Sequence, residues 1–234
     1  MFPNGNCECL LLVTLFHQKT KSSQKISINN TELEEVKDFK YLGSYISADS
    51  NIEKEISTRI RLTAQAFKRL QNIWKSTALH TKTKLKIYTS NVRSVLLHAS
   101  ETWRTNTKVE SRLRGFESHC LRCILKIRWQ QHVTNVEVNR RSGITNIVQE
   151  VKSRRWRWLG HVLRMNKQRH PHKVLRWTPQ GQRKRGRPLG TWRRTIEEMK
   201  AAGKTWNELN WLAQDRDGWR RFVGALCSTW SEEN

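Results

Sequence analysis

The stretch NIEKEISTRIRLTAQAFKRLQNIW, residues 51–74, decides the fold class because its apolar side chains recur at helical spacing. Polar residues fill the intervening positions, so one face is apolar and the opposite face is polar. This pattern is typical of an amphipathic α-helix that buries one side against neighbouring elements. The apolar stripe consists of Ile52, Ile56, Ile60, Phe67, Leu70 and Trp74.

The same period continues toward the C-terminus and predicts helices that bury one another. Their apolar stripes are Leu85, Tyr88, Val92 and Val95; then Val109, Leu113, Phe116, Cys120, Ile124 and Ile127 within 107–128; then Val148, Val151, Trp158, Leu159 and Val162 within 146–165; and finally Trp219, Phe222, Val223 and Leu226. A further helix is expected between Thr191 as its N-cap and Gly203 as its stop.

The pattern changes before residue 50, where Ile26 and Ile28 alternate with polar residues and Asn29-Asn30 supply a turn signal. A small β-hairpin or three short strands are expected here, with Gly43 interrupting the last strand as a bulge or a close backbone approach. The predicted fold is therefore mainly α, with a small N-terminal β-hairpin element, a helical bundle and a basic helical C-terminal region.

Charge points to a polyanionic partner. The 234-residue chain has 36% hydrophobic residues, enough for a real core, and a net charge of +24. Residues 151–196 contain no Asp or Glu but fifteen Lys and Arg. A one-sign block favours nucleic-acid contact over a merely solvated face. The expected contacts are Arg154, Arg155, Arg157, Arg164, Arg183, Lys184, Arg185, Arg187, Arg193 and Arg194.

Two stretches of this block carry finer alternatives. In QRKRGRPLGTWRR, residues 182–194, the tetrapeptide RGRP is similar to the core of an AT-hook, so phosphate binding, a nuclear-import signal and A·T minor-groove binding remain open. In RRWRWLGH, residues 154–161, the indoles are placed either to stack on unpaired bases or to pack in the core, and core is favoured for Trp158.

Metal and catalytic motifs give weaker signals. Cys120 and Cys123 form a C-x-x-C pair without a second half, so core cysteines are expected rather than zinc ligands. Asp215 and Asp217 are placed to favour a helix N-terminus rather than to bind magnesium. The run CLLLVTLFH, residues 9–17, is too short to cross a membrane. No cofactor and no membrane partner are expected, and the location is intracellular, with the nucleus favoured over the cytoplasm.

Five stretches in a fixed order carry a family resemblance: FKYLGSYIS (39–47), LLHASETW (96–103), RWRWLGHVLRM (155–165), GQRKRGRPLGTWRR (181–194) and LAQDRDGWRRFV (212–223). The series resembles the C-terminal part of reverse transcriptases of non-LTR, LINE-type retrotransposons, over residues 19–227. The resemblance implies a primer-grip-like hairpin that includes Phe39, Tyr41, Leu42 and Gly43, followed by a helical thumb.

The resemblance also implies a domain order: a palm-edge remnant at 1–50, a thumb-like bundle at 51–165, a basic linker at 166–190 and a C-terminal helical unit at 191–234. The catalytic Tyr/Phe-x-Asp-Asp turn of such polymerases has no counterpart, since the sequence contains no Asp-Asp pair. We therefore expect a truncated, non-enzymatic fragment that binds template RNA, target DNA or their hybrid, with Mg²⁺ needed only by the complete parent polymerase. Alternatives are a polymerase component complemented in trans by the missing palm and fingers, or a pseudogene product without function.

Overall fold

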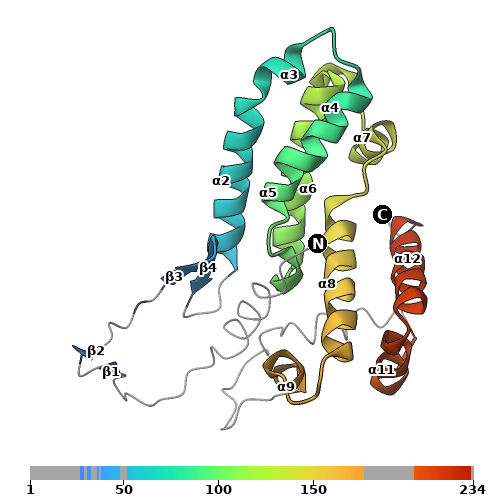
Figure 1. The fold of residues 1–234 in the computed structure, drawn as a ribbon. Coiled ribbons are helices and arrows are strands. Elements are labelled where there is room, and N and C mark those ends of the chain that lie inside the picture. Colours follow the sequence, from blue (N-terminus) through green and yellow to red (C-terminus); the bar gives the residue numbers. More distant parts are fainter. Residues whose placement is uncertain are drawn as a thin grey trace.

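The computed structural model describes residues 27–28, 31–32, 36, 38–47, 52–176 and 203–232. Long helices dominate these residues, and short antiparallel strands precede them (Figure 1). The predicted fold class is confirmed. The basic stretch 182–194 and the helix expected from Thr191 lie outside the described residues, as does the apolar run 9–17.

The strands form two small antiparallel hairpins. β1 (Ser27–Ile28) pairs with β2 (Thr31–Glu32), and β3 (Asp38–Tyr41) pairs with β4 (Ser44–Ser47). Leu42 and Gly43 connect β3 to β4 with φ angles of 46° and 84°. Two successive positive φ angles are typical of a tight hairpin turn, which matches the twist of the flanking strands. The interpretation of Gly43 as a break within one strand was wrong, because this glycine makes the turn between two strands.

The bundle begins with three long segments that run up, down and up again (Figure 1). α2 (Glu53–Arg69) leads through α3 (Gln71–Lys75) to a descending rod made of α4 (Thr81–Ile87), the π-helix η1 (Tyr88–Arg93) and α5 (Ser94–Leu96). After η2 (Ser100–Thr102), α6 (Thr107–Leu125) ascends beside both. The side chains that pack α3, α4, η1 and α6 together include Trp74, Tyr88 and Leu121.

One residue of the predicted apolar stripes is placed differently in the structure. Leu85, Tyr88 and Val92 are buried as the α-helical period predicts, but the next fully buried residue is Leu96 rather than Val95. Leu96 lies four residues after Val92, a spacing that the α-helical period also allows. The stripe of this rod therefore continues through Leu96, and Val95 lies at its margin.

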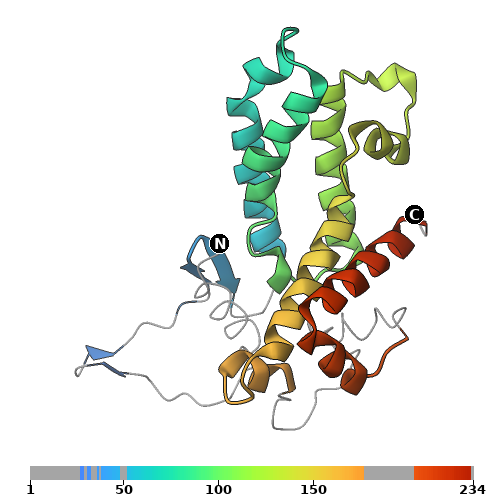
Figure 2. The ribbon, with the colours of Figure 1, turned by 45° about the vertical axis from the view of Figure 1, so that its right-hand side comes forward.

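α8 (Ile147–Arg164) follows η3 (Trp129–Gln131) and α7 (Asn135–Ser142) and joins two cores. Ile147 and Val151, near its start, pack with residues of α2, α5 and α6. Trp156 and Leu163, near its end, pack with α9, α11 and α12. Figure 2 shows α12 crossing the C-terminal half of α8.

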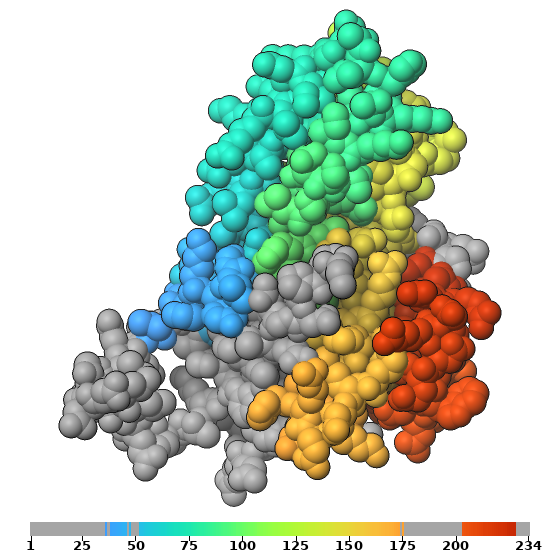
Figure 3. Space-filling view, viewed as in Figure 1, coloured from blue at the N-terminus to red at the C-terminus, as the bar shows by residue number. Residues whose placement is uncertain are grey.

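The C-terminal helices pack on α8. In Figure 3 the orange and red segments, which are the C-terminal ones, lie side by side below the green part of the bundle. α9 (His170–Arg176) lies in the segment predicted to be a linker, where Leu175 and His172 are buried. The segment predicted to be a basic linker therefore contains a helix that packs on α8. α11 (Trp206–Gln214) begins with a reciprocal cap between Thr205 and Glu208, and α12 (Arg216–Glu232) completes the packing.

Candidate nucleic-acid interface

The four predicted contact arginines of α8 have different surroundings. Arg157 is exposed and is free to meet a phosphate. Arg154 is half-buried, pairs with Glu150 at 3.0 Å and donates from Nη1 to the carbonyl of Leu97. Arg164 is half-buried and donates from Nη1 to the carbonyl of Ala213 at 2.9 Å. Arg154 and Arg164 thus hold α8 to neighbouring helices.

Arg155 is wholly buried, and this corrects its assignment as a contact residue. Its guanidinium donates to the carbonyl of Trp103 and to Oγ1 of Thr105. Burial lowers the pKa of Arg155 to about 10 because a charged group loses hydration inside the protein. A side chain with no exposed surface cannot reach a phosphate. The other six predicted contacts lie outside the described residues: Arg183, Lys184, Arg185, Arg187, Arg193 and Arg194.

The two tryptophans of the same motif, Trp156 and Trp158, differ in burial. Trp156 is 1% exposed and packs its ring against Trp219 and Phe222 of α12. Trp158, the residue expected in the core, is half-buried beside His161. Trp156 is therefore the central core residue of the pair, and it cannot stack on a base.

The β3–β4 hairpin, for which the resemblance predicts a primer-grip-like role, is docked on α2 by two buried charged residues. Arg59 donates from Nη2 to the carbonyl of Gly43 at 2.7 Å and to Oγ of Ser44 at 2.9 Å. Glu55 accepts from Nε of Arg59 at 2.6 Å and from the backbone N–H of Tyr45 at 2.7 Å. This ion pair fixes the hairpin by its backbone, so the side chains of the turn need not anchor it.

The side chains assigned to the primer grip lie mostly at the surface of this hairpin. Phe39 and Leu42 are 54% and 47% exposed, and Tyr41 is half-buried. The rings of Phe39 and Tyr41 stack with centroids 6.4 Å apart. Gly43 occupies the left-handed turn position. The structure therefore presents an apolar, aromatic edge on a rigid hairpin.

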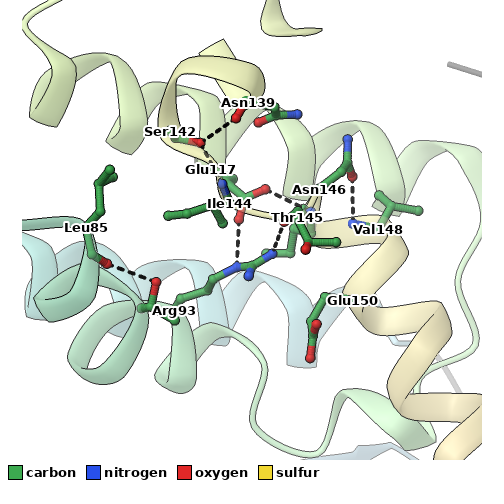
Figure 4. A network of polar contacts seen from close by, with 12 residues as sticks. Leu85, Arg93, Glu117, Asn139, Ser142, Ile144, Thr145, Asn146, Val148 and Glu150 are labelled. Carbon is green, nitrogen blue, oxygen red and sulfur yellow. Dashed lines mark hydrogen bonds and ion pairs between the residues drawn. The ribbon is translucent and has the colours of Figure 1, made fainter. Parts of the chain in front are cut away.

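A second buried ion pair holds α8 in place (Figure 4). Nε of Arg93 lies 2.9 Å from Oε1 of Glu117, and its Nη2 donates to the carbonyl of Thr145. The other carboxylate oxygen of Glu117 accepts from the backbone N–H of Ile147 at 2.8 Å. Burial raises the pKa of Glu117, an effect that the Arg93 charge opposes. The network joins η1, α6 and the start of α8.

Carboxylates along the bundle are thus paired. The described pairs are Glu53 with Lys108, Glu55 with Arg59, Glu110 with Arg114, Glu117 with Arg93, Glu137 with Arg140 and Arg141, and Glu150 with Arg154. Bases outnumber acids in the sequence, 44 Lys and Arg against 20 Asp and Glu, so positive charge remains in excess even where every acid is paired. This excess positive charge is available to an external polyanion.

The clearest group of such cations surrounds the end of the bundle where α2, α3 and α4 meet. We name it the tip cluster: Lys68, Arg69, Lys75, Lys82 and Lys86, all exposed. Within the described part of the chain, no ion pair joins these five side chains to a carboxylate. Lys84 differs, because it is buried and donates to the carbonyls of Trp74 and Ser76. The sequence signal for this cluster is the absence of Asp and Glu from residues 56–100.

The prediction of core cysteines is right for Cys120 and wrong for Cys123, which is exposed on α6. Cys120 is 1% exposed within the apolar face of α6, and burial raises its pKa to about 12. Asp215 accepts from the backbone N–H of Asp217 at 3.0 Å at the start of α12, as expected for a carboxylate at a helix N-terminus. Among the described residues, no group of three potential metal ligands comes together, and no helix has the length and apolarity to span a membrane.

Two comparisons with known proteins identify similar chains. Residues 66–98 match a family described as a domain of unknown function, DUF6451, and this range includes the tip cluster. The chain is also 26% identical, over 204 residues, to a Caenorhabditis elegans protein described as an uncharacterized transposon-derived protein; the similarity covers 83% of this chain and 73% of that protein. This similarity supports an origin in a transposable element. No solved structure matches the chain significantly.

Proposed function

We propose that this chain is a nucleic-acid-binding protein of a transposable element, derived from the C-terminal part of a LINE-type reverse transcriptase. The observation that carries the proposal is the tip cluster, five exposed cations in a 45-residue stretch without acids. Binding of such a cluster to phosphates releases counterions, which makes the binding free energy more favourable. Without a polyanion, the like charges of the cluster repel one another. RNA, DNA and hybrid all present this phosphate charge.

The resemblance to reverse transcriptases supports the finer part of the proposal. In such enzymes a hairpin and a helical thumb hold the nucleic acid beside the palm. The hairpin that carries Phe39 and Tyr41 is rigidly docked on α2, and α2 leads directly to the tip cluster. We propose that the chain binds without catalysing nucleotidyl transfer itself, because its sequence has no Asp-Asp pair to hold two magnesium ions.

The test is filter binding to RNA, duplex DNA and a hybrid over a range of salt concentrations. Each phosphate contact on duplex DNA contributes about −0.9 to the log-log slope, so six contacts predict a slope near −5. Lys75, Lys82 and Lys86 are then replaced together by Gln. The slope becomes shallower by as much as about 2.7 if all three meet phosphates.

The matched control removes the same charge from cations that already have acidic partners. Lys54, Lys108 and Arg114, replaced together by Gln, leave the tip cluster intact because their partners are Asp38, Glu53 and Glu110. The control slope is expected to remain near the wild-type value. A wild-type slope close to zero would refute nucleic-acid binding, and equal changes in the two triple variants would refute the tip as its location.

A further inference from the structure

The end of α6 forms an open pocket of about 810 Å³. After α6 the backbone turns at Lys126, with φ 56°, passes through η3 and turns again at His132, with φ 46°. These two left-handed residues fold the chain back beside α6, which leaves the hollow between them. The lining residues are His119, Arg122, Cys123, Lys126, Ile127, Arg128, Trp129, His132 and Val133.

The lining combines positive charge with one exposed indole. Arg122, Lys126 and Arg128 line the pocket, and none of its lining residues in the described part of the chain is a carboxylate. Trp129 is 79% exposed. Tryptophan side chains are highly buried on average. A large exposed ring beside a pocket therefore marks a contact surface.

The indole is held on a short, well-bonded turn. The backbone N–H of Arg128 donates to Oε1 of Gln131 at 3.1 Å, and the N–H of Gln131 donates back to the carbonyl of Arg128 at 3.1 Å. Nη2 of Arg122 donates to the carbonyl of Val133 at 2.7 Å and to Oδ1 of Asn135 at 2.9 Å. The pocket is thus formed before any ligand arrives, which reduces the entropy lost on binding.

We propose that this pocket takes one unpaired nucleotide of a single-stranded nucleic acid, with its base stacked on Trp129 and its phosphates against Lys126 and Arg128. The inference rests on the proposed nucleic-acid binding. The pocket volume lies within the usual range for small-ligand sites. A flat indole beside cations suits a base with a following phosphate, and it accepts any base because each has a π-face. Bases within a duplex have no free face, so a single strand is required.

A zinc ion fits the same pocket less well. His119, Cys123 and His132 line it, and Sγ of Cys123 lies 3.9 Å from Nε2 of His119, close enough for these two side chains to share an ion. The described residues bring no third metal ligand to this pair. Burial also raises the pKa of Cys123, whereas zinc binds the thiolate.

The experiment measures the anisotropy of labelled single-stranded 12-mers: oligo-dT, oligo-rU and an abasic DNA of equal charge. Wild-type protein is expected to bind both base-containing strands more tightly than the abasic strand. Trp129→Ala loses this preference, with affinity for oligo-dT and oligo-rU falling about fivefold or more, while affinity for the abasic strand is unchanged. Trp129→Phe retains most of the preference.

Trp211→Ala is the matched control, since Trp211 is 80% exposed on α11 and lies outside the pocket. Its preference for bases is expected to equal that of wild type. If Trp129→Ala keeps the wild-type preference for bases, or if Trp211→Ala loses as much, the inference is overturned while salt-dependent binding still stands. If wild type binds none of the strands, the proposed function itself fails. Zinc binding that Trp129→Ala leaves intact and that displaces the oligonucleotides would also overturn the inference.

Discussion

Gly160, near the end of α8, is expected to tolerate no side chain because α12 crosses it closely. A Cβ at this position would lie 2.2 Å from Nε1 and 2.5 Å from Cε2 of Trp219. Trp219 cannot easily retreat, since it is 2% exposed and its Nε1 donates to the carbonyl of Trp156 at 3.1 Å. The ring of Phe222 also packs on that of Trp219, with centroids 5.6 Å apart. The substitution Gly160→Ala therefore forces α8 and α12 apart.

The expected cost follows from three effects. Overpacking a core costs about 1–3 kcal/mol, and losing the hydrogen bond from Trp219 costs about 0.5–1.5 kcal/mol. Alanine in place of glycine within a helix returns about 1 kcal/mol. The net loss in free energy of unfolding for Gly160→Ala is thus about 2 kcal/mol.

Urea unfolding followed by circular dichroism measures this loss. Gly115→Ala in α6 is the control, because a Cβ there meets no atom within 4 Å. Gly115→Ala is expected to raise the free energy of unfolding by about 0.5–1 kcal/mol through helix propensity alone. Equal stabilisation by both substitutions would refute the close packing of α8 against α12.

Three further predictions concern charges and thiols. Arg157→Met makes the salt slope of duplex DNA binding shallower by about 0.9 if its exposed guanidinium meets a phosphate, whereas Arg155→Met leaves the slope unchanged because its guanidinium is buried. An NMR titration is expected to give the carboxyl of Glu137 a pKa of about 2, because Arg140 and Arg141 donate to it. Because folding lowers this pKa, the pairing of Glu137 stabilises the fold fully above about pH 4.3, the ordinary pKa of Glu, and this stabilisation is lost as the pH falls toward 2. Mass-spectrometric mapping after brief alkylation at pH 8 is expected to find Cys123 modified and Cys120 unmodified, since the thiol of Cys123 is exposed whereas that of Cys120 is buried.

The helices could be predicted from the sequence because a single period governs each apolar stripe. The helical period does not reveal which residues face inward where arginines and tryptophans alternate, as they do in RRWRW, residues 154–158. Trp156 and Trp158 stand two positions apart, and only the approach of α12 makes Trp156 the buried one. The choice between Val95 and Leu96 is similar, because the helical period allows both three and four residues after Val92.

The candidate interface was harder to predict because charge along the sequence says nothing about partners in space. Lys108 is paired with Glu53, which lies 55 positions away, and Arg155 is buried against a carbonyl 52 positions away. The sequence nevertheless indicates the tip cluster, because residues 56–100 contain no Asp or Glu and so provide its lysines with no acidic partner nearby in the sequence. The pocket at Trp129 has no such signal, because it depends on two left-handed turns after α6.

The packing of α12 on α8 changes what the resemblance to reverse transcriptases explains. The stretches RWRWLGHVLRM and LAQDRDGWRRFV meet in one contact, where Gly160 admits Trp219 and Arg164 bonds to the carbonyl of Ala213. Their joint occurrence in a sequence therefore follows from a shared core, without any need for nucleic acid. Arginines within such motifs are weak evidence for phosphate contacts. Where two helices pack together, an arginine can instead donate to a backbone carbonyl of the neighbouring helix, which would otherwise be buried without a partner. Stronger evidence comes from exposed cations for which the described residues form no ion pair, such as those of the tip cluster and Lys126 and Arg128 beside Trp129.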